Sequence, residues 1–460
     1  MTLIKSISGI RGTIGGRQGE NLTPVDIVMF TAAFGQWVKQ RKGKEKVTIV
    51  TGRDARPSGE MIANIVNSTL QAMGIDVTDV GLATTPTVEI AVQGTGADGG
   101  IIITASHNPV QWNALKLLND KGEFLSAGDG REVIGISRND DFIFADSDNA
   151  GRIIRDETWA KRHIDLIMNL KLVDSKKIAS AGFRVVVDCI NSVGSLVIPS
   201  LLERLGVREY ILINGVPDGK FAHNPEPLPE NLVQLSEKVK SSGADLGFAV
   251  DPDVDRLAIV CENGEMFGEE YTLVSVADYV LSQTPGNTVS NLSSTRALRD
   301  IASKYGGRHY TSAVGEVNVI QEMKKREAVI GGEGNGGIIY PALHYGRDAL
   351  AGIALFLTHL AIQKTTCSVL RKKYPDYYIE KRKIAREKDF DIERIKKAVA
   401  GVFPGFIIDE RDGICVESDE GWVHVRTSNT EPIIRVYAEA KYPEKAAELA
   451  EKVIRIVKNV

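Results

Sequence analysis

Cysteine is scarce in this sequence, and its spacing is uninformative for metal or redox chemistry. The 460 residues include four cysteines and no C-x-x-C pair; they are Cys189, Cys261, Cys367 and Cys415. This spacing predicts neither a disulfide framework nor a zinc site. A reducing, cytoplasmic environment is therefore expected.

Long apolar runs and an excess of one charge are also missing. The run from Ala349 to Ile362 contains Thr358 and His359 and is shorter than the ~20 residues that span a bilayer. The N-terminus lacks the apolar core of a secretory signal. With 56 Lys+Arg against 60 Asp+Glu, the net charge is −4, which gives no general attraction for nucleic acid or anionic membranes. Any anion must be held by a local cluster.

The composition is that of an ordinary folded enzyme. Apolar residues make up 43% and charged residues 25% of the chain, as in globular proteins generally. A chain of this length is expected to form roughly three or four domains.

Short β-branched runs alternate with helical patterns, which predicts an α/β fold with mostly parallel strands. Strands are expected at residues 46–50, 100–104, 183–188, 246–250, 288–292 and 328–331, with helices at 61–73 and 196–205. Strands at 423–426 and 433–437, followed by a helix at 443–457, predict a smaller α+β domain. Polar and turn-rich stretches place the domains at 1–155, 156–262, 263–372 and 373–460.

A first polar loop, Thr104-Ala-Ser-His-Asn-Pro109, follows one of these strands. Loops at the carboxyl ends of parallel strands commonly bind ligands, so Ser106 is a candidate nucleophile or phosphate carrier. Taken alone, the loop is equally well a polar turn. A Ser-His-Asp hydrolase is disfavoured because G-x-S-x-G is absent, and because His107 and Ser106 would point to opposite faces of an extended segment.

A second loop, Asp251-Pro-Asp-Val-Asp-Arg256, places three carboxylates two residues apart. Such a set can converge on one hard cation such as Mg²⁺ or Mn²⁺. An EF-hand is the rival interpretation, with Glu262 at its twelfth position, but Arg256 stands at the sixth position, where that loop needs glycine. A solvated acidic turn is the simpler alternative.

A third loop spans the glycine-rich residues 331–337. It contains G-x-G-x-x-G, but a strand-like segment ending at Pro341 follows where a dinucleotide site needs a helix. Glu333 and Asn335 offer groups that suit sugar hydroxyls. A flexible turn remains the alternative.

A fourth loop, Arg426-Thr-Ser-Asn-Thr-Glu-Pro432, lies between two predicted strands. Its hydroxyls, its backbone N–H groups and the charges of Arg426 and Arg435 would suit a non-reacting phosphate. An ordinary hairpin loop is the alternative. Together, the four loops supply the parts that transfer of a phosphoryl group on a sugar requires.

These four motifs, in this order, resemble those of the α-D-phosphohexomutase superfamily, and Ser8-Gly-Ile-Arg-Gly12 resembles its N-terminal active-site turn. The resemblance implies three related mixed α/β domains and a smaller α+β domain around a central cleft. It also implies a hexose phosphate substrate, a 1,6-bisphosphate intermediate and one Mg²⁺ per chain. The resemblance is compatible with either a monomer or a homodimer.

The resemblance also implies roles for individual residues. Ser106 would carry the phosphoryl group and, with Asp251, Asp253 and Asp255, bind the metal. The residues expected around the transferring group are Arg11, His107, Lys116 and Arg256. Those expected to bind the substrate are Glu333, Asn335, Arg426, Ser428, Asn429, Thr430 and Arg435.

The sequence departs from the family pattern at the sugar loop, which often reads G-E-x-S-G-H. Asn335 stands in place of the serine and Gly337 in place of the histidine. Glu316 and Ser293 stand where some members carry histidine and lysine. This form, with Tyr345-Gly-Arg-Asp348 after it, is more similar to phosphoglucosamine mutases and to archaeal-type phosphomannomutase/phosphoglucomutases. The sequence favours phosphoglucosamine mutase, with phosphomannomutase/phosphoglucomutase as the alternative; a Mg²⁺-dependent sugar phosphatase and a non-catalytic sensor are more distant.

Overall fold

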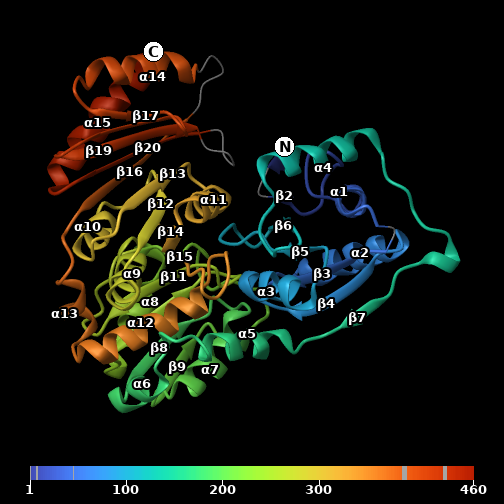
Figure 1. The fold of residues 1–460 in the computed structure, drawn as a ribbon, viewed down its shortest axis with the longest axis horizontal. Coiled ribbons are helices and arrows are strands. Elements are labelled where there is room, and N and C mark those ends of the chain that lie inside the picture. The colour runs from blue at the N-terminus through green and yellow to red at the C-terminus, as the bar shows by residue number, and fades with distance from the viewer. Residues whose placement is uncertain (1, 7–8, 45, 386–390, 428–432, 460) are drawn as a thin grey trace. The chain divides into compact units, whose positions relative to one another are not determined.

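The computed structural model describes residues 2–6, 9–44, 46–385, 391–427 and 433–459. The chain forms two compact units, each built from two segments. Figure 1 labels the helices and strands. The first unit comprises Met1–Thr272 and Asn335–Leu370, and the second comprises Leu273–Gly334 and Arg371–Val460. The described residues form four sheets with helices packed on them, which confirms the predicted α/β class.

A seven-stranded mixed sheet begins the first unit. Its order is β1 (Ile4–Ser6), β2 (Gly9–Thr13), β6 (Trp112–Leu118), β5 (Gly99–Ile103), β3 (Thr48–Arg53), β4 (Asp76–Leu82) and β7 (Ile153–Arg155). Around it lie α1 (Pro24–Lys42), α2 (Gly59–Ala72), α3 (Thr85–Thr95), α4 (Ala127–Asn139) and the short 3₁₀ helix η1 (Ser147–Asn149). Residues of α1, α2 and α4 share one apolar core with the sheet.

The pairing of β3 with β5 brings two loops to one sheet edge. The strands are parallel, and Arg53 pairs with Ile103 at their carboxyl ends. The turn after Arg53 and the loop after Ile103 therefore leave the sheet side by side. This register places the Ser106 loop beside residues 54–58.

The second sheet of the first unit carries the aspartate loop. Its order is β11 (Leu257–Cys261), β10 (Leu246–Val250), β8 (Arg184–Asp188) and β9 (Glu209–Ile213). β10 is buried along its whole length and is antiparallel to β11, so residues 251–256 form the connection between two core strands. The associated helices are α5 (Trp159–Met168), α6 (Ser175–Ala181), α7 (Gly194–Leu205), the 3₁₀ helix η2 (Pro229–Asn231) and α8 (Val233–Ser242).

The longest apolar run of the sequence forms a core helix. After β15 (Gly337–Ile339), α12 (Ala349–Gln363) packs against α5, α6 and α7 and is buried from Ala349 to Ala361. The Asp348 side chain caps its first turn by accepting hydrogen bonds from the N–H groups of Leu350 and Ala351. No helix in the described ranges is both long and apolar enough to cross a membrane.

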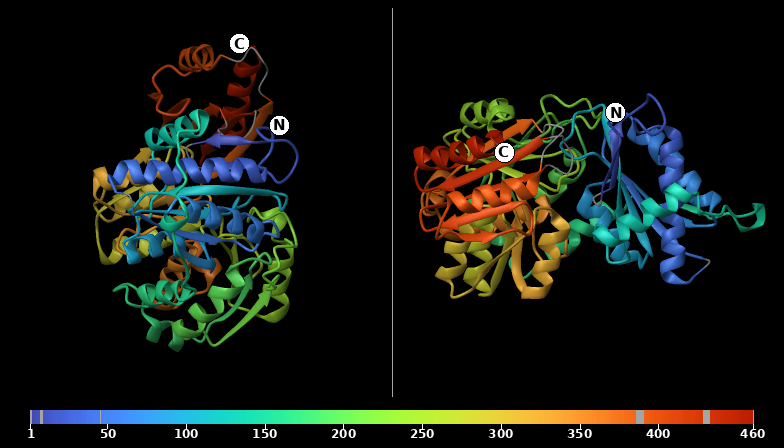
Figure 2. Two further views of the ribbon diagram at one scale, coloured as in Figure 1. Left: turned by 90° about the vertical axis from the view of Figure 1, so that its right-hand side faces the viewer. Right: turned by 90° about the horizontal axis from the view of Figure 1, so that it is seen from above.

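The second unit has one parallel and one antiparallel set of strands. The parallel strands run in the order β13 (His309–Ser312), β12 (Asn287–Asn291) and β14 (Ala328–Glu333), with α10 (Ala297–Lys304) and α11 (Glu316–Arg326). The antiparallel order is β16 (Tyr378–Ala385), β20 (Ile433–Ala440), β19 (Gly421–Thr427), β18 (Ile414–Ser418) and β17 (Ile407–Asp409). Helices α14 (Ile392–Val402) and α15 (Pro443–Asn459) contribute to the apolar core of this antiparallel sheet. Both belong to the orange and red part of the ribbon in Figure 2. Helices α9 (Tyr271–Gln283) and α13 (Cys367–Arg371) contain two of the three points where the chain passes between units, and the third lies between Gly334 and Asn335.

Two predicted loop limits are wrong in this unit. The prediction ended the strand at residue 331, but β14 continues to Glu333 because Gly331 and Gly332 still pair with β12. The prediction ended the next strand at Arg426, but β19 continues to Thr427, which still pairs with Ile434 of β20, while Arg426 lies opposite Arg435. In both cases pairing with a neighbouring strand extends the element beyond what the local sequence indicates.

A buried carboxyl group, Glu439 of β20, lies inside the second unit. Its side chain has no exposed area, and its Oε1 accepts hydrogen bonds from the Arg296 backbone N–H at 3.0 Å and the Trp422 Nε1–H at 2.9 Å. Its Oε2 has no hydrogen-bond partner among the described residues. Burial raises the pKa of Glu439 to about 7 from its ordinary value of 4.5.

We expect this carboxyl group to make the second unit less stable at alkaline pH. Because the folded pKa is raised, the stabilisation is complete below pH 4.5 and is lost as the pH rises through about 7. Each pKa unit corresponds to about 1.4 kcal/mol, so Glu439→Gln should raise the free energy of unfolding by up to about 3 kcal/mol at pH 8.5 and by less than about 1 kcal/mol at pH 5. Urea titrations followed by Trp422 fluorescence measure this; the exposed Glu444→Gln is the control. Equal effects of Glu439→Gln at both pH values would contradict the assignment.

Candidate active site

The Ser106 loop turns sharply where β5 ends. Ser106 has a φ of +49°, a left-handed conformation that non-glycine residues adopt infrequently. Its backbone N–H donates to Thr104 Oγ1 at 2.9 Å. The predicted extended segment through Ser106 and His107 is therefore wrong, because the chain must reverse here to enter the antiparallel strand β6.

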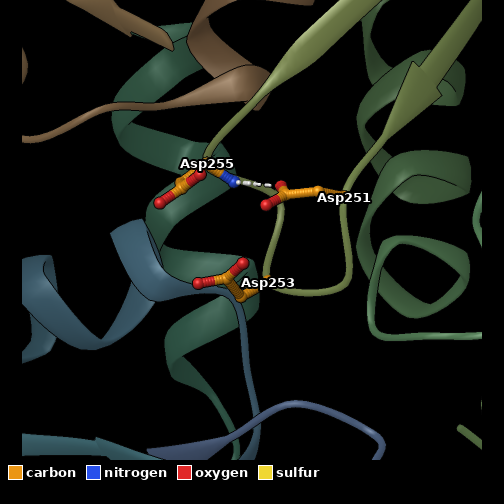
Figure 3. Close-up of side chains that lie close together, drawn as sticks. All are labelled: Asp251, Asp253 and Asp255. Atoms are coloured by element: carbon orange, nitrogen blue, oxygen red, sulfur yellow. Dashed lines mark hydrogen bonds between the residues drawn. The ribbon is translucent and has the colours of Figure 1, made fainter. Parts of the chain in front are cut away.

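The aspartate loop presents three carboxylates to a common space (Figure 3). Asp251, Asp253 and Asp255 are fully buried, and one oxygen of each lies within 4.8 Å of the others. Asp251 Oδ1 accepts the backbone N–H groups of Asp255 and Arg256, both at 3.1 Å. Between the acids, Val254 has a φ of +61°, which is strained for a β-branched residue. The loop is thus held in a shape that converges the carboxylates.

The serine and the aspartates meet in the first unit. Ser106 Oγ donates to Asp251 Oδ2 at 2.6 Å. Lys116 of β6 donates to Asp253 Oδ2 at 2.7 Å and lies 3.7 Å from Asp255 Oδ2. The structure therefore brings together segments that the sequence separates by well over a hundred positions.

The protonation of these groups reflects burial and mutual charge. Burial raises the pKa of Asp251 well above its usual range, and repulsion from Asp255 and Asp253 adds to this effect. Burial also acts to raise the pKa of Asp253, but Lys116 outweighs it and holds that pKa below its ordinary value. Burial acts to lower the pKa of Lys116, yet Asp253 and Asp255 together raise it. Lys116 is therefore a cation near neutral pH.

These residues fit a divalent cation. Asp253 Oδ1 and Asp255 Oδ1 are buried and have no hydrogen-bond partner within the described part of the chain, which is costly unless something binds them. Carboxylate oxygens are the ligands that Mg²⁺ prefers. A cation would also relieve the repulsion that raises the pKa of Asp251.

His107 and Arg256 form a pair beside the aspartates. Arg256 donates from Nη2 to His107 Nδ1 at 2.9 Å, and its Nη1 lies 3.6 Å from Glu226 Oε1. Burial lowers the pKa of His107 well below its ordinary value, and Arg256 and Arg11 lower it further. Neutral His107 thus accepts at Nδ1, so its proton lies on Nε2. Burial and the Arg256 charge likewise lower the pKa of Arg11, on β2, although an arginine side chain stays charged.

Arg347 is a contributor that the sequence reasoning did not identify as part of the site. Its Nη2 donates to Asp255 Oδ2 at 2.6 Å. A Cβ atom on Gly337 would lie 2.3 Å from Arg347 Cδ, so glycine at this position leaves room for the arginine. The glycine that replaces the family's histidine at position 337 therefore leaves space for Arg347, which pairs with Asp255. The Gly337–Arg347 spacing in the sequence gave no sign of this contact.

Thr85 and Arg56 were also missed. Thr85 begins α3 and holds Asp253 twice: its N–H donates to the Asp253 backbone oxygen at 2.9 Å and its Oγ1 donates to Oδ2 at 2.6 Å. Arg56 lies under the Ser106 loop and donates to Ser106 O at 2.5 Å. Both residues follow strands of the first sheet, Arg56 after β3 and Thr85 after β4. Their place after the carboxyl end of a strand was the one feature of the sequence that could have indicated a role in the site.

The predicted substrate-binding residues fall in both units. In the second unit, Glu333 accepts from Asn291 Nδ2 at 2.8 Å and from the Gly315 N–H at 3.0 Å, while Arg426 lies 3.7 Å from Asp412. Asn335 belongs to the first unit, where its Oδ1 accepts the Gly337 N–H at 3.2 Å. Three of the predicted residues lie outside the described part of the chain: Ser428, Asn429 and Thr430.

The two further positions noted in the sequence also lie in the second unit. Ser293 Oγ is 2.8 Å from His424 Nδ1. Glu316 is buried at the start of α11, directly after Gly315.

Comparison with known proteins agrees with this site. Four family models match in order, namely phosphoglucomutase/phosphomannomutase α/β/α domain I at residues 3–143, domain II at 161–264, domain III at 268–378 and the C-terminal domain at 380–456. A Thermococcus kodakarensis protein named phosphoglucomutase/phosphomannomutase is 39% identical over 97% of this chain and 98% of its own length. A probable phosphoglucosamine mutase of Methanopyrus kandleri is 34% identical over 98% of this chain and 97% of its own.

A solved structure shares the fold along the whole chain. A phosphoglucomutase/phosphomannomutase family protein from Burkholderia thailandensis superimposes with a TM-score of 0.85 at 26% identity, covering 99% of this chain and 97% of that one. The ordered matches, the full-length relatives and the serine–aspartate geometry lead to one conclusion. The chain belongs to the phosphoglucomutase/phosphomannomutase family of α-D-phosphohexomutases.

Proposed function

We propose that this family member interconverts hexose 6-phosphate and hexose 1-phosphate through a phosphorylated Ser106 and a 1,6-bisphosphate intermediate. The hydrogen bond from Ser106 Oγ to Asp251, at the edge of three buried carboxylates, is the observation that carries the proposal. A phosphoryl group on this oxygen would lie beside a cation site and near Lys116 and Arg256.

The reaction would consist of two opposite phosphoryl transfers at one serine. A free sugar hydroxyl attacks the phosphorus on Ser106, so the bond to Oγ breaks, a bond to the sugar oxygen forms and a base accepts the hydroxyl proton. The departing Ser106 Oγ takes up a proton. In the second transfer a base removes this proton, and Ser106 Oγ attacks the phosphorus of the other phosphate of the resulting bisphosphate. The bond from that phosphorus to the sugar oxygen breaks, and the sugar oxygen takes up a proton as the product monophosphate leaves. The cycle ends with Ser106 phosphorylated, as it began, so atoms and charge balance.

The proposed residues act mainly by neutralising and orienting charge, as phosphoryl transfer requires. Mg²⁺, one ion per chain, would bind at Asp251, Asp253, Asp255 and Ser106 and supply neutralisation of phosphoryl oxygens. Lys116 and Arg256 add positive charge, and Arg11 is proposed to act with them. His107, protonated at Nε2, is a donor to a phosphoryl oxygen and not a base in this state.

Glucosamine phosphate is the substrate that we propose first. Relatives that carry the name probable phosphoglucosamine mutase match the full chain, including the Methanopyrus kandleri protein at 34% identity. Phosphomannomutase/phosphoglucomutase is the alternative, because the Thermococcus kodakarensis relative with that name is 39% identical. Glu333 and Asn335 are proposed to bind sugar hydroxyls. The non-reacting phosphate is assigned to Arg426, Ser428, Asn429, Thr430 and Arg435.

Three further features belong to the same proposal. The protein would act in the cytoplasm, as a monomer or a homodimer. The four domains would span 1–155, 156–262, 263–372 and 373–460.

Side-by-side kinetics test the function and the substrate together. The protein with Mg²⁺ is assayed with glucosamine, glucose and mannose 6-phosphates, with and without a trace of the matching 1,6-bisphosphate, while free phosphate is measured. We expect isomerisation at about 1–10³ s⁻¹, stimulated by the bisphosphate, without phosphate release. Phosphate release without isomerisation would indicate a phosphatase instead. Activity on glucose and mannose substrates without any on glucosamine would establish the alternative.

A further inference from the structure

Arg56 is a fully buried arginine whose hydrogen bonds all lie within the first unit. It is 1% exposed and sits in the turn after β3. Its Nε donates to Asp54 Oδ2 at 3.0 Å. Its Nη atoms donate to four backbone oxygens, those of Ser106 at 2.5 Å, Asn108 at 2.6 Å, Pro109 at 2.7 Å and Trp112 at 3.0 Å. All five N–H groups of the guanidinium are therefore used.

Three of these acceptors belong to the loop that carries Ser106, and the fourth, Trp112, is the first residue of β6. Residues 104–111 belong to no strand or helix, so their carbonyl groups lack the partners that regular structure would supply. A buried backbone oxygen without a partner is costly. Arg56 supplies donors to Ser106 O and Asn108 O, and a further donor to Pro109 O, which also accepts the Trp112 N–H at 3.0 Å. Arg56 thus takes the place of a sheet neighbour for the loop.

A second chain of hydrogen bonds reaches the serine from the same turn. Asp54 is fully buried and accepts from Thr104 Oγ1 at 2.6 Å as well as from Arg56. Thr104 Oγ1 in turn accepts the Ser106 N–H at 2.9 Å. This fixes both the N–H and the carbonyl of a residue held at a φ of +49°.

The same turn is also tied to the aspartate loop. The Ala55 N–H donates to Ser192 Oγ at 3.4 Å, and Ser192 Oγ donates to the Pro252 backbone oxygen at 2.7 Å. Arg56 stacks over the Phe221 ring at 4.9 Å, and a Cβ on Gly219 would lie 2.0 Å from the Ala55 oxygen. The turn therefore contacts both loops whose spacing sets the distance from Ser106 to Asp251.

We propose that Arg56 is a positioning residue for phosphoryl transfer: through the turn of residues 54–56 it fixes the Ser106 loop against the aspartate loop. The proposal rests on the proposed role of Ser106 as the phosphoryl carrier. All five N–H groups of Arg56 are bonded to protein oxygens, so none is left for a substrate or a cation. Arg56 acts by holding the serine oxygen at the distance and angle that transfer needs.

Two substitutions and one control test the proposal in the full-length enzyme with Mg²⁺. Arg56→Met should lower kcat by about 100-fold, the order expected for a displacement near 1 Å, with KM changed less than about threefold. Arg56→Lys keeps the charge and three donors and should recover part of kcat. Ile178→Ala, a cavity variant in α6, far from these loops in sequence, should lower the melting temperature with kcat nearly unchanged.

Hydrogen exchange of the amides in residues 104–112 provides a readout that does not depend on turnover. It should rise in Arg56→Met and remain at the wild-type level in Ile178→Ala. If Arg56→Met does not fold, Arg56→Lys is judged by the same two measurements. Wild-type kcat and exchange in the folded Arg56 variants would overturn the proposal, as would an equal loss of kcat in Ile178→Ala. If an unphosphorylated Ser106→Ala enzyme kept full turnover while exchange rose in Arg56→Met, the proposed function would fail and the role of Arg56 in ordering the loop would stand.

Discussion

The Ser106→Ala variant is expected to lose mutase turnover by about 10⁴-fold or more, the order seen when a covalent nucleophile is removed from other enzymes. Alanine has no oxygen to carry the phosphoryl group, while the Arg56, Asp54 and Thr104 contacts that order the loop stay in place. Steady-state kinetics measure the loss. Intact-mass analysis after incubation with glucose 1,6-bisphosphate should show one phosphoryl group on the wild type and none on the variant.

The left-handed backbone at Ser106 calls for a second variant. Alanine at a φ of +49° carries the same strain as serine, whereas glycine adopts it freely. Ser106→Gly should therefore be equally inactive and at least as well folded around the loop. Ser137→Ala removes another buried serine hydroxyl, bonded to Ile134 O in α4, and should keep full activity. Turnover near the wild-type rate in both Ser106 variants would rule out the phosphoserine mechanism.

Removal of divalent metal is expected to lower turnover by about 10³-fold or more, with recovery when Mg²⁺ is added back. Without a cation, three buried carboxylates face one another within 4.8 Å, and the phosphoryl group on Ser106 would add further negative charge. The same electrostatics predict that the metal-free protein is less stable. At a Mg²⁺ concentration 100 times Kd, binding stabilises the folded state by about 2.7 kcal/mol, which a thermal melt detects.

A matched pair of aspartate variants tests whether the stabilisation by Mg²⁺ comes from the aspartate loop of residues 251–256. Asp253→Asn removes one of the three charges and should abolish most of the Mg²⁺-dependent rise in melting temperature. Asp278→Asn, in the second unit, breaks an ion pair with Lys304 at 2.8 Å but leaves the loop intact, so its Mg²⁺ response should match the wild type. If the melting temperature of the wild type did not change with Mg²⁺ concentration, a cation site at these residues would be refuted.

The proposed reacting groups could be selected from the sequence because the residue types that suit the chemistry lie close together in it. Ser106 and the three aspartates follow strongly apolar strands, and alternate carboxylates around Pro252 are the ligand type that Mg²⁺ prefers. Helix 443–457 was likewise predictable from its apolar period, and the structure extends it only to Asn459. Strand ends were less predictable because pairing, not local preference, carries β14 to Glu333.

The supporting arginines could not be predicted from the sequence. A lone arginine in a turn, such as Arg56, is usually solvent-exposed, and nothing nearby in the sequence names the backbone oxygens that it binds. Those oxygens lie 50 to 56 positions away. Arg347 and Asp255 are 92 positions apart, and their contact depends on the room left by Gly337. Such partners are set by tertiary structure alone.

The two-segment composition of the first unit determines when the site can be completed during synthesis. Ser106 and its loop leave the ribosome early, and the aspartates follow with β10 and β11, but Arg347 and α12 belong to the segment Asn335–Leu370. The ribosome must make the first portion of the second unit, Leu273–Gly334, before that segment emerges. A nascent chain that stops before residue 335 therefore contains Ser106 and all three aspartates but lacks the arginine that pairs with Asp255. In such a chain the faces of α5, α6 and α7 that pack against α12 remain exposed to solvent.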